Sequence, residues 1–577
     1  MFYNRRIISI LLLLSSAAVL NAQSQVKVSE TRETIPTYLV GNPDLYPYFF
    51  NGRTYQGAAG HVYPYPMYDN LTDERVDRDY KYLTLENEYT KIGVLPEIGG
   101  RIFSAEDKQT GYNFFYRQHV IRPALIGMIG SWISGGVEWN IPHHHRASST
   151  LNAGYEITEN EDGSKTIWIG ETELRQRLKW TIGLTMFPGK SYVEATFKMQ
   201  NRTPLMQSFL YWANVSVHCD DNYQVQFPPQ TIYGTAHSKV QYTDWPYNTL
   251  WGDTQPTDNS WWKNFKNSNS TFAVNYSQDY LVGYDFGKDA GTAHWANHHL
   301  VPGKKFFLWG TESVWNELLT EEDGAYLELM VGTLSDNQPD YSWIGPNEVR
   351  VTKQYWYPIK GIGGAKNATL EGAVNIERTS PESFMVGFNS TALYKEAKVI
   401  IKAAGKILSE ETVTIDPDTP YIKSVKVPST LKDSEFFAGL YDSDGVELVS
   451  WSPVVKDEYA RPHPADRPKT PAEYSSVEEL LLAGQRLEEF HNARLDPLPY
   501  YEEALRRDSL DSRVNVNLGI YYAKRAEWTV AEKYLNRAYK RLTGLHYMPE
   551  IDKTGVIYHT NPKDGEMFYY SGVVARA

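Results

Sequence analysis

One stretch of the sequence gathers histidine and carboxylate side chains that could transfer protons. Residues 134–146 read SGGVEWNIPHHHR, and ten of the 14 histidines lie within the first 299 positions. In an extended chain alternate side chains share a face, as Glu138 would with Asn140 and His143 with His145. Imidazole and carboxylate groups are the usual general acids and bases of enzymes. We therefore take Glu138 and His143 as catalytic candidates and His145 as a substrate-binding candidate.

Two other interpretations of the histidine run stay open. It could be a solvated loop, or a zinc site, because paired imidazoles can ligate zinc. The run has neither a fixed pair four residues apart nor an evident carboxylate partner, and Cys219 is the one cysteine of the chain. The sequence also lacks a P-loop, a dinucleotide-binding fingerprint and an HExxH motif. We therefore expect no metal ion and no cofactor.

Arginine residues flank this stretch and could hold an anion. They are Arg101, Arg117, Arg122 and Arg146. A guanidinium group forms bidentate pairs with carboxylate or sulfate groups, so we take Arg101 and Arg146 as substrate-binding candidates. The alternative is a set of ordinary surface ion pairs.

Two strand-like segments supply further candidates. Glu328 lies in the segment YLELMVG, where it would share a face with Tyr326 and Met330. Such a carboxylate has a raised pKa unless it is paired, which suits a general acid or base, although a structural carboxylate fits the pattern nearly as well. His218 follows the strand-like residues 209–217 and is the other catalytic candidate.

Aromatic residues are unusually frequent in this chain. The 42 Tyr, 21 Phe and 16 Trp make up 14% of it. They suit a large β core, because aromatic side chains favour strands. They also suit a groove in which rings stack on sugar faces. On the second interpretation, Trp139, Tyr211 and Trp212 are substrate-binding candidates.

The elements that must position these residues are short strands. Residues 191–199 alternate with period two, and Gly, Pro, Asn and Asp separate many similar segments. We expect residues 25–365 to form one large β-supersandwich. Residues 366–450 have shorter strands and no tryptophan, which predicts a separate immunoglobulin-like β-sandwich.

The N-terminal segment has the features of a targeting signal. Residues 1–22 contain two arginines, an apolar run of about fourteen residues and a small residue at the expected cut. The run is too short for a comfortable membrane span. We therefore expect a signal peptide, a periplasmic or secreted protein, and no membrane span after cleavage.

The C-terminal part changes to a helical period. Residues 451–475 hold five prolines, which predicts a stiff linker. In residues 476–577, small and large side chains such as Gly519 and Leu535 recur at the spacing of tetratricopeptide repeats. The expected fold class is therefore multidomain and mainly β, followed by α-helical tetratricopeptide repeats that could hold a protein partner.

The charge of the chain excludes one class of function. The formal net charge is −13 at pH 7. A dedicated nucleic-acid-binding protein should carry a basic face, so we expect no nucleic-acid partner.

Several motifs resemble those of galactose-mutarotase-like domains. Residues 94–104 read VLPEIGGRIFS, which resembles the opening of such domains, where a Gly-Gly strand turns back over the sugar site. Gly135-Gly136 followed by Pro142 is similar to a second element, and Glu328 stands where the resemblance implies a catalytic glutamate. More closely, nearly the whole chain resembles a family of exported Bacteroidota proteins. That family joins a mutarotase-like supersandwich, catalogued as a domain of unknown function, to tetratricopeptide repeats.

One departure from the mutarotase pattern concerns the reaction. Mutarotases place a histidine next to the aromatic residue of the central segment. Here that position reads Tyr211-Trp212, and the nearest histidine is His218. Simple interconversion of anomers is therefore not the favoured reaction.

These observations support competing hypotheses about function. The favoured one is an exported enzyme of polysaccharide degradation that acts on acidic, uronate-containing oligosaccharides by elimination, as a lyase or dehydratase. Arginines would neutralise the carboxylate, and an acid–base pair would remove a proton and expel the leaving oxygen. The alternatives are a glycoside hydrolase that uses Glu138 and Glu328, epimerase-like chemistry, and a non-catalytic glycan-binding or scaffold protein.

Overall fold

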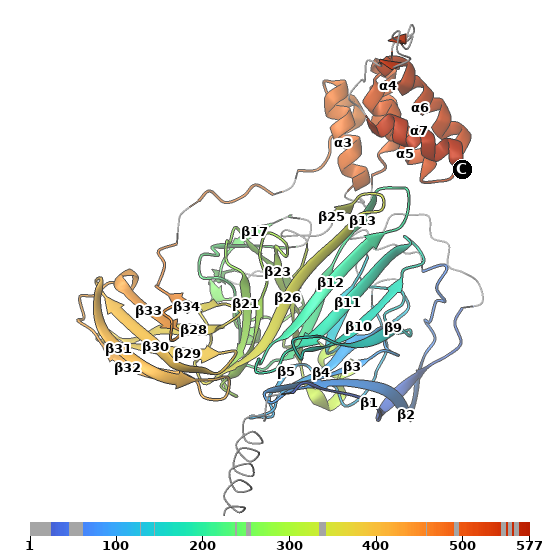
Figure 1. Cartoon of the computed structure of the whole chain (residues 1–577). Coiled ribbons are helices and arrows are strands. Elements are labelled where there is room, and N and C mark those ends of the chain that lie inside the picture. Colours follow the sequence, from blue (N-terminus) through green and yellow to red (C-terminus); the bar gives the residue numbers. More distant parts are fainter. Residues whose placement is uncertain are drawn as a thin grey trace, which may run out of the picture.

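The computed structural model in Figure 1 describes most of the chain. The described residues are 25–44, 62–126, 129–142, 145–236, 239, 241–249, 255–333, 342–456, 459–464, 466–489, 495–543, 550–551, 557–558 and 565–577. Residues 1–22, where the signal peptide is predicted, and His143 lie outside the described residues. Among the described helices, none is long and apolar enough to cross a membrane.

Two large antiparallel sheets form the first β unit. The first sheet runs in the order β1 (Lys27–Val40), β2 (Leu71–Glu86), β3 (Thr90–Leu95), β4 (Arg101–Asp107), β8 (Val137–Asn140), β14 (Trp212–His218), β24 (Tyr326–Gly332), β23 (Gly303–Leu308), β20 (Asn269–Val274), β16 (Tyr233–Thr235) and β17 (Tyr242–Asp244), with β5 (Asn113–Phe115) paired to β4. The second sheet runs in the order β15 (Tyr223–Gln226), β21 (Tyr280–Asp285), β22 (Ala290–Trp295), β26 (Val349–Lys360), β12 (Val193–Asn201), β11 (Leu178–Met186), β10 (Lys165–Thr172) and β9 (Gly154–Glu159).

Shorter strands and helices complete this unit. The short strand pairs are β6 (Ala124–Leu125) with β7 (Ser131–Trp132), β13 (Gln207–Phe209) with β25 (Ser342–Ile344), and β18 (Tyr247–Asn248) with β19 (Thr257–Asp258). The short helices are η3 (Trp262–Asn264), α2 (Trp315–Leu318) and η4 (Glu321–Asp323).

The two large sheets pack against each other through an apolar core. Val137, Trp139 and Val215 of the first sheet share one buried cluster with Phe197 and Trp356 of the second. The rings of Trp139 and Trp356 lie 6.5 Å apart. Since side chains alternate along a strand, the residues between these apolar ones point to the opposite face of the first sheet.

A second β unit spans residues 367–451 and lies at one end of the first (Figure 1). One of its sheets is β27 (Asn367–Ala368), β28 (Gly372–Ser380), β29 (Ser383–Ser390) and β32 (Tyr421–Lys426), and the other is β31 (Lys406–Ile415), β30 (Tyr394–Ala403), β33 (Phe436–Tyr441) and β34 (Glu447–Trp451), with η5 (Asp433–Glu435) before β33. The unit has its own core, in which the rings of Phe384 and Phe436 stack 4.1 Å apart.

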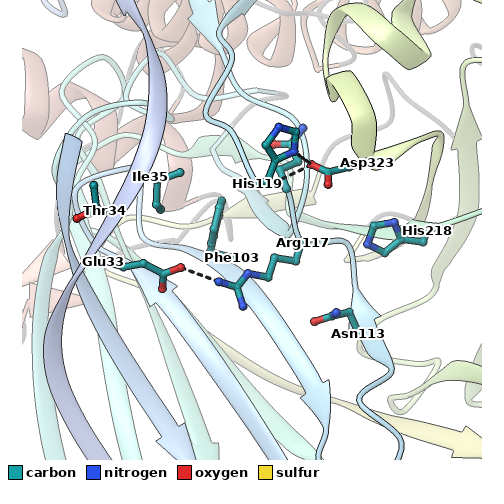
Figure 2. Close-up of a pocket in the computed structure, with 10 residues that line it drawn as sticks. Glu33, Thr34, Ile35, Phe103, Asn113, Arg117, His119, His218 and Asp323 are labelled. Carbon is teal, nitrogen blue, oxygen red and sulfur yellow. Dashed lines mark hydrogen bonds and ion pairs between the residues drawn. The ribbon is translucent and has the colours of Figure 1, made fainter. Parts of the chain in front are cut away.

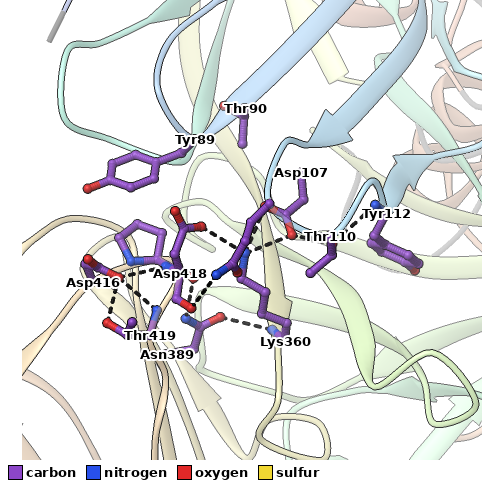
Figure 3. A network of polar contacts seen from close by, with 12 residues as sticks. Tyr89, Thr90, Asp107, Thr110, Tyr112, Lys360, Asn389, Asp416, Asp418 and Thr419 are labelled. Atoms are coloured by element: carbon purple, nitrogen blue, oxygen red, sulfur yellow. Dashed lines mark hydrogen bonds and ion pairs between the residues drawn. The ribbon is translucent and has the colours of Figure 1, made fainter.

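A buried ion-pair network ties the two β units together (Figure 3). The amine of Lys360, at the end of β26, donates to both carboxylate oxygens of Asp107 at 2.9 and 2.8 Å and to Asp418 of the second unit at 3.1 Å. The backbone N–H of Lys360 donates to Asn389 of β29, whose amide donates to the carbonyl of Pro417. Lys360 and Asp107 are both buried, so the junction depends on the pairing of their charges.

The segment after the second β unit lies along the first one. The backbone carbonyl of Tyr459 accepts a hydrogen bond from Tyr233 at 3.1 Å, and Arg461 pairs with Asp244. The amine of Lys456 donates to the carbonyl of Thr231 at 2.9 Å. The predicted linker is therefore held against the β16–β17 edge of the first sheet.

The C-terminal region consists of helices. They are η6 (Pro471–Glu473), α3 (Val477–Glu489), α4 (Leu498–Arg507), α5 (Ser512–Ala523), α6 (Trp528–Thr543) and α7 (Gly565–Arg576), with a strand pair β35 (Glu550–Ile551) and β36 (Ile557–Tyr558) before α7. Helix α7 packs against α6 and also reaches the first β unit, where Tyr569 donates to the carbonyl of Pro204 at 2.7 Å.

The structure corrects the predicted fold class. Strands make up 45% and helices 16% of the described residues, which is a mostly β chain with a C-terminal helical region. The predicted tetratricopeptide repeats are not confirmed: α3, α5 and α7 begin at Val477, Ser512 and Gly565, and the second interval is longer than the first. The small residues that suggested repeats have a local cause: a Cβ on Gly519 would lie 2.6 Å from Leu535, so α5 and α6 approach closely there.

We predict that removing the Lys360 amine weakens the junction. The variant Lys360→Met leaves Asp107 buried without its cation, which should lower the free energy of unfolding by about 3–5 kcal/mol. Chemical denaturation followed by fluorescence measures this change. The control Lys266→Met removes an exposed pair with Glu312 and should cost about 0–1 kcal/mol. Equal effects of the two variants would contradict the role of the junction.

Candidate active site

The central strands of the first sheet carry polar side chains on the face that points away from the core. Glu138 on β8 lies opposite Asn214 on β14, and Ser216 on β14 lies opposite Glu328 on β24. On the next strand, Lys305 of β23 lies opposite Met330 of β24. The same face also carries Arg101, Phe103, Asn140, Trp212, His218, Tyr326 and Phe307. We call this the polar face of the first sheet.

Glu138 and His145 form a buried pair on the polar face. The Nδ1 atom of His145 lies 3.1 and 3.0 Å from the two carboxylate oxygens of Glu138. The indole N–H of Trp132 donates to the same carboxylate at 2.9 Å, and the Trp132 ring meets the His145 ring edge-on. Both carboxylate oxygens are thus engaged, and the imidazole is held in one orientation.

The pair shifts the pKa of each partner. Burial alone would raise the pKa of Glu138, but the charge and hydrogen bond of His145, with Arg101 nearby, hold it below its usual range. Burial alone would lower the pKa of His145, but the carboxylate of Glu138 raises it. The arrangement therefore favours an imidazolium beside a carboxylate, which can act as a general acid.

A second pair, Glu328 and Lys305, lies on the neighbouring strands. Burial, together with the charge of Glu138, raises the pKa of Glu328 to about 7 against the attraction of His145. Burial lowers the pKa of Lys305 to about 8 against the attraction of Glu328. The amide of Asn214 donates to Glu328 at 3.4 Å. Both groups can therefore change protonation near neutral pH, as acid–base catalysis requires.

Several buried polar atoms of the polar face have no partner among the described residues. They are Nε and Nη2 of Arg101, Oδ1 of Asn140, Oδ1 of Asn214 and Nε1 of Trp212. Arg101 is fixed by hydrogen bonds from its other nitrogen to the carbonyls of Ser134 and Gly135 at 2.8 and 3.0 Å. Unpaired buried donors and acceptors are costly, and in native proteins bound water or a polar ligand commonly satisfies such atoms.

The structure brings some predicted site residues together. Glu138, His145, Glu328, Arg101 and Trp212 all belong to the polar face or touch it. Two residues that the sequence analysis did not select complete the arrangement. Lys305 could not be distinguished from Lys304 without the register of β23, and Trp132 gave no signal except its closeness to Glu138 in the sequence.

Other predicted residues serve the core. Trp139 faces the space between the sheets, and Tyr211 stacks on Phe197 at 4.0 Å. Arg146 stacks on the ring of Trp180 and donates to the carbonyl of Gly99 at 2.6 Å, so it supports the fold. The positions of these three side chains correct their assignment to substrate binding.

The remaining predictions have different outcomes. His218 lies on the polar face but behind Tyr116, whose ring stacks on it at 3.9 Å, so it does not join Glu328. Arg117 pairs with Glu33, which removes it from the expected arginine cluster. Among the described residues, no group of three or more metal-ligating side chains is present; the zinc interpretation included His143, which is not described.

Comparisons with known proteins agree with part of this picture. A family model described as a domain of unknown function, DUF5107, matches residues 58–359, and a model described as the second domain of YphG-like proteins matches residues 367–451. The first match confirms one part of the resemblance, namely that the chain contains a catalogued domain of unknown function.

Solved structures with a similar fold include a TPR-domain-containing protein from Parabacteroides distasonis. It is 18% identical over 90% of this chain and 82% of its own, with a TM-score of 0.51. Galactose mutarotase-like proteins from Clostridium acetobutylicum and Lactobacillus casei are 8% and 9% identical. They cover 49% and 48% of this chain and 96% and 99% of their own, with TM-scores of 0.36 and 0.34. Scores this low support no inference, and the first similarity concerns the fold alone.

We predict that Glu138 controls the protonation of His145. The variant Glu138→Gln removes the negative charge and keeps nearly the same side-chain shape. The effect of burial on His145 is then no longer opposed by a carboxylate, so the pKa of His145 should fall below its ordinary value. A pH titration of the imidazole resonances by NMR measures the shift, with His145→Gln to assign the signal. The exposed substitution Glu156→Gln should leave the midpoint in place, and an unchanged midpoint in Glu138→Gln would refute the pairing.

Proposed function

The chain belongs to the DUF5107 family, and from this premise we propose that it is an enzyme that processes a carbohydrate by proton transfer on the polar face. Glu328 is the proposed general base and His145, oriented by Glu138, the general acid. Lys305 and Arg101 supply positive charge. The observation that carries the proposal is the buried cluster of Glu328, Lys305, His145 and Glu138, in which the pKa values of Glu328 and Lys305 lie near 7 and 8.

Such a cluster would lower the stability of a protein that only binds glycans or serves as a scaffold, without any benefit to its function. Burying four ionisable groups reduces stability unless every charge is paired, and no stabilising role requires a carboxyl and an amine that both titrate near neutrality. Pairs of groups whose surroundings move their pKa values toward the working pH are typical of acid–base sites. This argument favours an enzyme over a purely glycan-binding module.

The proposed substrate class follows from the unpaired hydrogen-bonding atoms of the site, which a ligand would have to satisfy. The unpaired atoms include donors on Arg101 and Trp212 and acceptors on Asn140 and Asn214. A sugar hydroxyl both donates and accepts, so one ring can satisfy several of them. The resemblance of residues 94–104 to the opening of galactose-mutarotase-like domains supports the same class.

We propose elimination on a uronate-containing oligosaccharide as the reaction. Arg101 and Lys305 would neutralise the substrate carboxylate, which makes the adjacent C–H bond more acidic. The carboxylate of Glu328 would take that proton, a carbon–carbon double bond would form, and the carbon–oxygen bond would break as His145 protonates the leaving oxygen. The step is a lyase reaction if the leaving group is a sugar and a dehydration if it is water.

Hydrolysis by Glu138 and Glu328 is the alternative reaction. It needs one carboxylate free to attack the sugar or to activate a water. Both oxygens of Glu138 accept hydrogen bonds from His145 and Trp132. Because both of its oxygens are occupied, Glu138 is better suited to orienting His145 than to attacking the sugar.

We also propose export of the protein, on the basis of the signal-like residues 1–22.

We predict that Glu328→Gln removes turnover and leaves the fold intact. Loss of a general base reduces the rate by about 10²–10⁴-fold, while a neutral amide of the same size still fills the buried position. Release of unsaturated product from oligouronates, measured by absorbance and mass, reports the rate. The exposed variant Glu312→Gln should match the wild type. Full activity of Glu328→Gln would rule out the proposed function.

We predict a bell-shaped dependence of the rate on pH. Activity should rise as Glu328 loses its proton at a pKa of about 7 and fall as Lys305 loses its charge at about 8. In Lys305→Met the nearby positive charge is gone, so the pKa of Glu328 and the acid limb of the profile should move to higher pH. Lys266→Met, at an exposed position, serves as the control. An acid limb that stays in place would show that the two groups are not coupled.

A further inference from the structure

A second polar pocket lies beside the polar face (Figure 2). Its volume is about 490 Å³, within the range of ordinary ligand sites. Glu33, Thr34 and Ile35 of β1 line one side, and His119, His218 and Asp323 line the other. Asn113, Arg117, Gln118 and Phe103 complete the lining. The acid–base residues Glu328, Lys305, Glu138 and His145 are not part of it.

Two buried tyrosines separate this pocket from the candidate active site. The ring of Tyr116 lies 3.9 Å from that of His218 and 5.6 Å from that of Tyr326, and both tyrosines are fully buried. Glu328 lies opposite Ser216, and His218 follows Ser216 by two residues on β14, which is about 7 Å along a strand. The pocket is therefore a separate site on the same sheet.

The charges of the pocket are paired internally. Arg117 contacts Glu33 at 2.6 Å, and Nδ1 of His119 lies 2.7 Å from Asp323. Glu321, next to His119, also has Arg75 and Arg122 within 3.6 Å. The lining holds two carboxylates, one guanidinium and the His119 imidazole, so it offers no excess of positive charge to an anion.

The same groups still offer hydrogen bonds to a neutral ligand. Burial lowers the pKa of His218 to about 4, so at neutral pH its ring is uncharged and carries one donor and one acceptor. The amide of Asn113 and the partly exposed carboxylates of Glu33 and Asp323 add both kinds of group. Closely spaced donors and acceptors without an excess of positive charge suit a polyhydroxylated, uncharged molecule.

We infer that this pocket is a second carbohydrate-binding site, which holds a neutral sugar unit through Arg117, His218 and Asn113. The inference rests on the proposed function, because the ligand class is taken from it. The substrate is then an oligosaccharide with a reacting unit at Glu328 and a neutral unit at His218, about 7 Å along β14 from Ser216, the residue opposite Glu328. The pocket contributes affinity and selection of the substrate, and the chemistry stays with the acid–base cluster.

The test is a binding titration with the full-length protein in the Glu328→Gln background, which does not depend on turnover. Neutral disaccharides and tetrasaccharides of glucose, galactose, mannose and xylose are the probes, measured by calorimetry. At least one should bind, and Arg117→Ala and His218→Phe should each weaken it at least tenfold. His218→Phe keeps the ring that stacks on Tyr116, and Arg117 belongs to an exposed ion pair, so both variants should fold.

The matched control is Arg350→Ala. Arg350 has the same side-chain exposure as Arg117, 45%, and pairs with Glu348 outside the pocket. Its removal should leave the affinity unchanged. Equal affinity of the pocket variants and the control, or no binding of any probe, would overturn the inference. Loss of turnover in Glu328→Gln would still stand in that case, so the two failures are distinguishable.

Discussion

The contact between the carboxylate of Glu138 and the imidazole of His145 is the interaction on which the rest of the site depends. Strand β8 is buried along its whole length, so a charge there has lost its hydration and must be balanced by a partner. His145 supplies that partner at 3.0 Å, and Trp132 fixes the carboxylate from its other side. The field of this pair reaches Glu328 two strands away, where the charge of Glu138 and the charge of His145 act in opposite directions. One buried contact thus sets the orientation of His145 and influences the protonation of Glu328.

The antiparallel register of the first sheet converts this local pairing into a site. Side chains of β8, β14, β24 and β23 alternate between the apolar core and the polar face, so Glu138, Glu328 and Lys305 converge although they are far apart in sequence. His145 reaches the same face from the loop that follows β8. The rigidity of the core behind them keeps the distances constant. At the other end of the same unit, Lys360 joins Asp107 of the first β unit to Asp418 of the second, which fixes the second unit against the end of β4. The charges of the proposed site and those of the junction between the β units therefore lie at separate places in the fold.

Much of this arrangement could be predicted from the sequence, and the failures have physical reasons. The period of two correctly placed Glu138 with Asn140 and Glu328 with Tyr326 and Met330. The same period places Trp139 on the opposite face from Glu138, so the sequence already argued against Trp139 as a substrate-binding residue. Lys305 could not be found, because only the pairing of β23 with β24 distinguishes it from Lys304. His218 was selected because it follows a strand-like segment; it does lie on the polar face, but the ring of Tyr116, from a distant segment, stacks on it. The helical repeats were inferred from the spacing of small and large residues, which shows only that neighbouring helices approach closely, as α5 and α6 do at Gly519.

The central claim is that the buried cluster transfers protons on a sugar substrate. The most direct measurement is incubation of the protein with uronate-containing and neutral oligosaccharides, followed by mass and by absorbance of a conjugated double bond. The account predicts products from the uronates that carry this absorbance and have gained no water. Cleavage with gain of water and without the absorbance, or no conversion of any uronate in the panel, would contradict it.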